Sequence, residues 1–156
     1  MLVLPTGVRE RISAHAREGY PHEVCGLLLG KMHGVAPGDR REVATSMRAR
    51  NLNSERPHDR YLMDPKDVNA ADQTAREQGL EIVGFYHSHP DHPARPSQYD
   101  LDHAWPTFAY VIVAVAAGAA AEMTVWYLKE DRTTFEKGEL HGDENSDSNT
   151  AAAVHR

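Results

Sequence analysis

Residues 24–30 have the sequence VCGLLLG, a compact apolar run that is bounded by glycine. The run is too short for a buried helix, and we therefore expect a buried strand. Residues 81–87, EIVGFYH, have the same character and predict a second strong strand. Weaker signals predict a strand at residues 42–47 and a hairpin at residues 108–115 and 123–128, joined through an Ala/Gly turn.

Helical signals lie between these strands. In residues 6–18 apolar side chains recur every four positions before a glycine and a proline end the pattern. Residues 64–79 begin with Asp-Pro, which is typical of an N-cap followed by proline at the first helical position, and end at glycine. The S-x-x-D sequence at residues 97–100 is typical of a capping box and predicts a short helix that a proline closes.

This order of elements predicts an α/β fold. Strands interleaved with helices imply a mixed β-sheet sandwiched by helices, and the adjacent last two strands imply that part of the sheet is antiparallel. A length of 156 residues suits one domain, which we place at residues 1–137. Residues 138–156 are rich in small polar and acidic residues without periodicity, and we expect a disordered tail there.

Composition excludes several classes of protein. The net charge of −6 has the wrong sign for nonspecific binding of nucleic acid. The single cysteine, Cys25, rules out an internal disulfide framework and a CxxC site, and a reducing compartment, the cytoplasm, is expected. The N-terminus does not resemble a secretory signal, and the longest apolar run, residues 108–121, is too short to cross a membrane.

The segment after the second strong strand carries the candidate chemistry. His87 and His89 lie two residues apart on a strand, so both imidazoles face the same side. Pro90 turns the chain out of the sheet, and Asp100 returns in the first turn of the next helix. Two imidazoles and one carboxylate form a zinc set that leaves the fourth position for water. No H-E-x-x-H motif is present, so a distant residue, Glu23, is the candidate base.

These residues together resemble the JAMM/MPN+ zinc metalloprotease signature. The match consists of EVCGLLLG at residues 23–30, HSHP at residues 87–90, seven residues between His89 and Ser97, and then Asp100. The element order extends the resemblance over residues 8–128. It implies the layered MPN/JAB fold, which is similar to that of cytidine deaminases, and a small bacterial single-domain type of enzyme.

The resemblance also implies a role for each residue of the match. His87, His89 and Asp100 would bind one Zn²⁺ per chain. Glu23 would take a proton from the zinc-bound water that attacks the substrate and pass it to the leaving amine. Ser97 would steady the oxyanion. It could instead be solely a helix N-cap, since both roles are compatible only if its hydroxyl leaves the cap.

The substrate implied by the resemblance is a ubiquitin-like or sulfur-carrier protein that is cut after its C-terminal Gly-Gly. The substrate tail would add a strand to the sheet edge near two loops, and Arg56, Tyr61 and Trp105 are the candidate contacts there. The arginines of residues 48–60 form either a solvated basic loop or a contact for an acidic partner. Exposed strand edges also make a homodimer possible.

Other interpretations of the same residues stay open at this point. The chain could be a metal-free MPN scaffold that docks a partner, although such scaffolds typically lack a ligand. A zinc deaminase is a third possibility, but the P-C-x-x-C half of its signature is absent. Four residues near the motif could be misassigned as ligands: Asp91, His92, Asp102 and His103.

Overall fold

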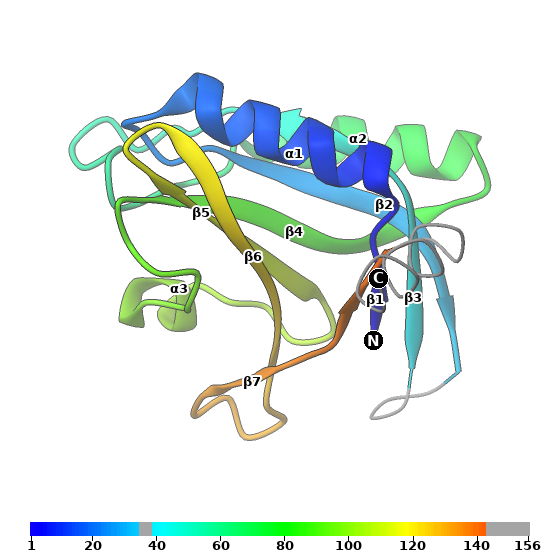
Figure 1. Cartoon of the computed structure of the whole chain (residues 1–156). Coiled ribbons are helices and arrows are strands. Elements are labelled where there is room, and N and C mark those ends of the chain that lie inside the picture. The colour runs from blue at the N-terminus through cyan, green and yellow to red at the C-terminus, as the bar shows by residue number, and fades with distance from the viewer. Residues whose placement is uncertain (35–38, 143–156) are drawn as a thin grey trace, which may run out of the picture.

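The computed structural model describes residues 1–34 and 39–142 of the chain. It contains one mixed eight-stranded sheet and three helices (Figure 1). The elements in chain order are β1 (Leu2–Val3), α1 (Thr6–Gly19), β2 (Cys25–His33), β3 (Arg40–Ala49), α2 (Pro65–Glu77), β4 (Glu81–Pro90), α3 (Gln98–Asp102), β5 (Ala109–Ala116), β6 (Ala119–Leu128), β7 (Phe135–Lys137) and β8 (Leu140–His141). The predicted α/β fold is confirmed.

The two strongest predicted strands lie at the centre of the sheet. The strand order is β7-β6-β5-β4-β2-β3-β1-β8, with parallel pairs β4/β5, β1/β3 and β1/β8. Strands β2 and β4 run antiparallel, and Cys25 at the start of β2 pairs with His87 near the end of β4. Glu23, two residues before Cys25, is therefore brought to the end of β4 that carries the histidines.

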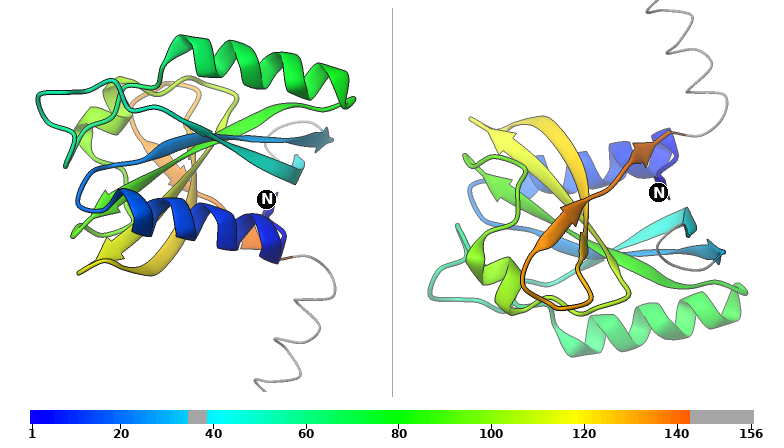
Figure 2. Two further views of the ribbon diagram at one scale, coloured as in Figure 1. Left: turned by 90° about the horizontal axis from the view of Figure 1, so that it is seen from above. Right: turned by 90° about the horizontal axis from the view of Figure 1, so that it is seen from below.

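Helices cover both faces of the central strands. Seen from above, the sheet lies between α1 on one side and α2 on the other (Figure 2, left). Because side chains alternate along β2, Leu28 packs into the core under α1, whereas Leu27 and Leu29 pack under α2. Both cores use small residues on the facing helices, such as Ala16 in α1 and Ala71 in α2.

A buried arginine joins parts of the sheet that are distant in sequence. The Arg41 guanidinium donates to the backbone carbonyls of Val83 at 2.8 Å and Thr107 at 2.6 Å. It also pairs with the Asp39 carboxylate at 2.8 Å and lies 5.3 Å from the centre of the Tyr127 ring. Every contact compensates a charge that burial removes from water, so Arg41 fixes β3 against β4 and the loop before β5.

The C-terminal boundary differs from the expectation. Residues 138–142 were predicted in the tail, but Leu140–His141 forms β8 and pairs in parallel with β1. Strands β1, β7 and β8 were also missed because two or three residues are too few to show a period. The tail prediction for residues 143–156 lies outside the described residues, and no helix among the described ones is long and apolar enough to cross a membrane.

The contact between Gly26 and Tyr86 gives a stability prediction. A Cβ on Gly26 would overlap the Tyr86 ring, which is buried and is fixed by a 2.6 Å hydrogen bond between its hydroxyl and His15 Nδ1. We expect Gly26→Ala to lower the free energy of unfolding by about 1–3 kcal/mol, as overpacking does. Gly7→Ala, which meets no atom within 4 Å, is the control and should not destabilise. Urea denaturation measures both; equal stability of the two variants would contradict the prediction.

Candidate metal centre

Two histidines meet at the end of β4. Their Nε2 atoms lie 3.2 Å apart, and both rings are buried. The His87 ring stacks on Tyr61 with 4.7 Å between the ring centres, whereas His89 Nδ1 donates to the Pro93 carbonyl at 2.8 Å. Because a carbonyl only accepts, the His89 proton sits on Nδ1, and Nε2 of the neutral ring presents a lone pair.

Asp100 completes the set from the first turn of α3. Its Oδ2 atom lies 3.2 Å from His87 Nε2 and 3.0 Å from His89 Nε2. The same oxygen accepts a hydrogen bond from the Ser97 backbone at 2.9 Å, as one half of the predicted capping box. Burial would raise the pKa of the Asp100 carboxyl, but the two imidazoles outweigh burial and hold it well below its usual range.

The three donor atoms fit the ligand set of a zinc ion. They form a triangle with edges of 3.0–3.2 Å. Two ligands of a tetrahedral zinc, each 2.0–2.1 Å from the metal, lie about 3.3 Å apart. Lone pairs that converge in a buried place are stabilised by a cation or by a proton on one ring. The His89–Pro93 hydrogen bond is also typical of a metal-binding histidine, whose second nitrogen donates to a carbonyl.

Glu23 lies beside this triangle, in the turn before β2. Its carboxylate is in a buried group with His87 and His89 in which the ligand atoms lie within 4.8 Å of one another. Glu23 Oε1 is buried and has no hydrogen-bond partner in the described part of the chain. Burial raises the pKa of Glu23 to about 8, although the nearby His89 acts in the opposite direction. Such a carboxyl is able to take up and release protons near neutral pH.

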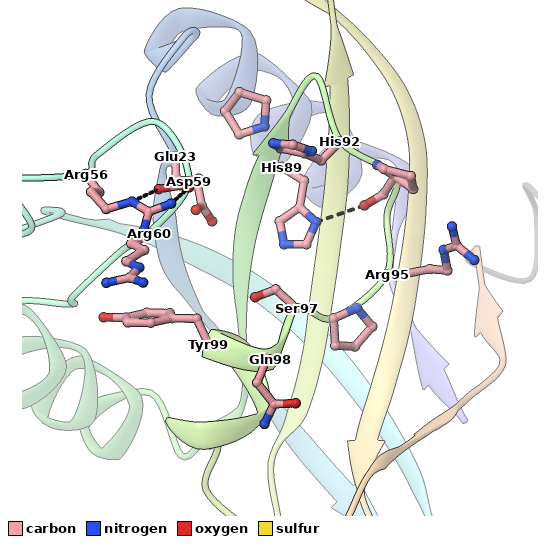
Figure 3. A pocket seen from close by; sticks show the side chains of 13 residues that line it. Glu23, Arg56, Asp59, Arg60, His89, His92, Arg95, Ser97, Gln98 and Tyr99 are labelled. Carbon is pink, nitrogen blue, oxygen red and sulfur yellow. Dashed lines mark hydrogen bonds and ion pairs between the residues drawn. The ribbon is translucent and has the colours of Figure 1, made fainter.

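An open pocket of about 670 Å³ exposes the cluster to solvent, and Glu23, His89 and Ser97 are among its lining residues (Figure 3). The Ser97 hydroxyl accepts a hydrogen bond from the Asp100 backbone at 3.0 Å. A hydroxyl that accepts still has its own proton to donate. Ser97 therefore caps the helix, and its hydroxyl still has a proton with which to form a hydrogen bond; its role toward an oxyanion stays a prediction.

The structure separates the three candidate substrate contacts. Arg56 lines the pocket, where it forms an ion pair with Asp59. Tyr61 does not line the pocket and packs on the far side of His87. Trp105 is 67% exposed and lies outside the pocket lining.

The four residues that could have been mistaken for ligands have other contacts or positions. Asp91 accepts hydrogen bonds from the Tyr20 hydroxyl and the Ala117 backbone. Asp102 accepts one from Gln98, and His103 stacks on Tyr99. His92 is exposed on the pocket wall. None of the four belongs to the donor cluster found among the described residues.

Two positioning residues were not identified from the sequence. The Ser88 hydroxyl accepts from the Val24 backbone at 2.9 Å, so the residue between the histidines also holds the segment next to Glu23. The Asn51 amide donates to the Glu23 and Arg60 carbonyls, each at 3.1 Å. Its oxygen accepts from the backbones of residues 53 and 62, so all four hydrogen-bonding sites are used. The signal for Ser88 was its place inside HSHP; Asn51 lies in an ordinary loop sequence.

Comparison with known proteins agrees with this geometry. The family model described as prokaryotic homologs of the JAB domain matches residues 5–129. A desampylase of Haloferax volcanii is 36% identical over 116 residues, which are 71% of this chain and 78% of the relative. A probable TtuB-protein conjugate cleaving protease of Thermus thermophilus is 34% identical, over 72% of this chain and 69% of its own.

A solved structure shows the same fold over nearly the whole chain. It is a protein from Desulfitobacterium hafniense with a TM-score of 0.79 and 32% identity, and the match covers 92% of this chain and 94% of that one. The structural match and the family match both span the strands and the helix that carry the donor triangle. The chain belongs to the family of prokaryotic homologs of the JAB domain.

Proposed function

We propose that this chain is a JAMM-type zinc metallopeptidase that hydrolyses the amide or isopeptide bond after the C-terminal Gly-Gly of a ubiquitin-like or sulfur-carrier protein. The observation that carries the proposal is the buried triangle of His87, His89 and Asp100, with a Glu23 carboxyl oxygen beside it that has no hydrogen-bond partner among residues 1–34 and 39–142. Two relatives support it by name, one as a desampylase and one as a protease that cleaves protein conjugates.

Each residue of the site has its own role in the proposed hydrolysis. His87, His89 and Asp100 would hold the zinc, which when bound lowers the pKa of a water and polarises the scissile carbonyl. Glu23 accepts the proton of the attacking water and delivers it to the leaving amine, a task that suits a carboxyl whose pKa lies near neutrality. The Ser97 hydroxyl donates a hydrogen bond to the oxyanion.

The binding of the carrier is the less defined part of the proposal. Arg56 on the pocket wall is the best placed of the three candidate contacts, whereas Trp105 would meet the carrier outside the pocket. Tyr61 orients the His87 ring by stacking on it and does not contact the substrate. A cytoplasmic location, suggested by the lone buried thiol of Cys25, and a homodimer are further parts of the proposal.

The first test removes the proton acceptor. Glu23→Gln keeps the size of the side chain but cannot carry the proton, so we expect kcat to fall by about 100-fold to 10,000-fold. Zinc content and melting temperature should stay unchanged. The measurement is cleavage of a Gly-Gly-ending carrier fusion, followed by mass spectrometry. Glu10→Gln, an exposed residue of α1, is the matched control, and normal cleavage by Glu23→Gln would remove this residue from the mechanism.

The second test removes one donor of the triangle. Asp100→Asn retains an oxygen for the Ser97 backbone but loses the charge that faces the two imidazoles. We expect zinc affinity to fall by more than about 100-fold, which is the upper end of the loss caused by removing a group that merely supports a ligand.

Asp102→Asn makes the same chemical change on the same helix, at a carboxylate that accepts a hydrogen bond from Gln98 and lies outside the triangle, so it should bind zinc normally. Elemental analysis and chelator competition measure both variants. Absence of tightly bound zinc from the purified wild-type chain would favour the metal-free scaffold and contradict the enzyme.

A further inference from the structure

Three of the four arginines in residues 48–60 have a carboxylate partner. Arg48 pairs with Glu18, Arg50 with Asp64 and Asp67, and Arg56 with Asp59. The basic loop predicted from the sequence is therefore largely neutralised within the protein itself.

Arg60 is the fourth arginine of this segment and the exception among them. It is half-buried, it lines the pocket, and no carboxylate among the described residues lies within ion-pair distance of it. The nearest acidic neighbour in sequence, Asp59, has both oxygens engaged by Arg56. A partly desolvated guanidinium that forms no ion pair with the described residues favours an anionic ligand.

The Arg60 side chain is also held in place. Its guanidinium lies 5.0 Å from the centre of the Tyr99 ring, within the range of a cation–π contact (Figure 3). Tyr99 is itself fixed, since its ring stacks on His103 at 4.0 Å and its hydroxyl donates to the Tyr61 carbonyl at 3.3 Å. A cation that is already ordered binds an anion without a further loss of side-chain entropy.

The position of Arg60 relative to Glu23 indicates which part of a substrate it meets. The Asn51 amide donates to both backbones, and both residues line the same pocket. In the proposed reaction Glu23 returns its proton to the leaving amine, so the leaving group lies on the Glu23 side of the donor triangle. Arg60 is on that side, across the pocket from Arg95 (Figure 3).

We propose that Arg60 is a specificity residue that binds a carboxylate of the leaving group, so that preferred substrates carry an acidic residue directly after Gly-Gly. This inference rests on the proposed hydrolase function and adds the chemical class of the leaving group. The acid is the side chain of that residue.

The test compares two fusions of one Gly-Gly-ending sulfur-carrier protein, extended by Glu-Ala-amide or by Gln-Ala-amide. We expect the wild type to cleave the Glu fusion with a kcat/KM roughly tenfold higher, the value of one hydrogen bond to a charged group. Arg60→Gln should abolish this ratio, whereas Arg60→Lys should retain part of it. Arg48→Gln makes the same charge change at the Glu18 pair and should keep the full ratio.

Measuring how tightly the fusions bind distinguishes a failure of this inference from a failure of the proposed function. Both fusions are titrated against the Glu23→Gln variant with and without the Arg60 substitution. Tighter binding of the Glu fusion that is lost with the Arg60 substitution supports the inference. If the wild type cleaves neither fusion, that second result counts against the proposed hydrolase and not against the role of Arg60. Equal binding and equal cleavage of the two fusions would overturn the inference, as would a ratio that persists in Arg60→Gln.

A different set of contacts carries a second inference, on the loop between His89 and Ser97. The Thr124 hydroxyl of β6 donates to the Ala94 carbonyl at 2.7 Å, and it accepts from Trp126 Nε1 at 2.8 Å. Ala94 is buried against β5 and is next to Pro93, whose carbonyl accepts from His89 Nδ1. We infer that Thr124 is a positioning residue, which fixes His89 through the loop.

The test measures zinc affinity by chelator competition. Thr124→Val removes both hydrogen bonds at nearly constant volume, and we expect affinity to fall by about 10-fold to 100-fold. Thr124→Ser should restore it. Val125→Ala, on the opposite face of the same strand, controls for general destabilisation and should bind zinc normally. Equal affinity of Thr124→Val and wild type would overturn the assignment, and so would an equal loss in Val125→Ala.

Discussion

The antiparallel ladder between β2 and β4 is the constraint on which the rest of the structure depends. It pairs Cys25 with His87, and so it places Glu23 and the two histidines at the same end of the sheet although more than sixty residues separate them. Side-chain alternation then sends both imidazoles to one face of the sheet. A slip of one residue in this register would turn the histidines to the other face, away from α3. The close contact between Gly26 and the Tyr86 ring opposes that slip, since any side chain moved to this position would overlap the ring.

The same end of the sheet gathers polar groups at a cost in stability. Three atoms able to bind a metal converge within about one hydrogen-bond length, and the Glu23 oxygen beside them has no partner in the described residues. Buried charges of this kind contribute little to folding and often oppose it. A cation that binds the native arrangement alone stabilises it by mass action. The cluster is therefore best explained as a binding site that the hydrophobic cores hold in place.

Sequence predicted the framework and the donor set because both depend on local signals. The strands around Leu28 and Val83, and the helix start at Asp64, follow from periodicity and capping chemistry. The histidines and Asp100 follow from spacing on a strand and in a first turn. The contacts that support the donor set could not be predicted from the sequence, since each one joins segments far apart in the chain. Thr124 meets Ala94 across thirty residues, and the amide of Asn51 meets Glu23 across twenty-eight. Nothing in the sequence near Thr124 or Asn51 indicates the partner.

The division between strands and loops also explains how one donor set can serve different substrates. His87, His89 and Asp100 lie on regular elements, which place them by backbone geometry. Arg60 lies on the long connection between β3 and α2, and the Asn51 amide is one of several groups that hold this loop. Changing a loop residue alters what the pocket binds without moving the triangle. Two relatives of similar identity to this chain carry different names, a desampylase and a probable TtuB-protein conjugate cleaving protease, and a fold alone does not fix what a site acts on.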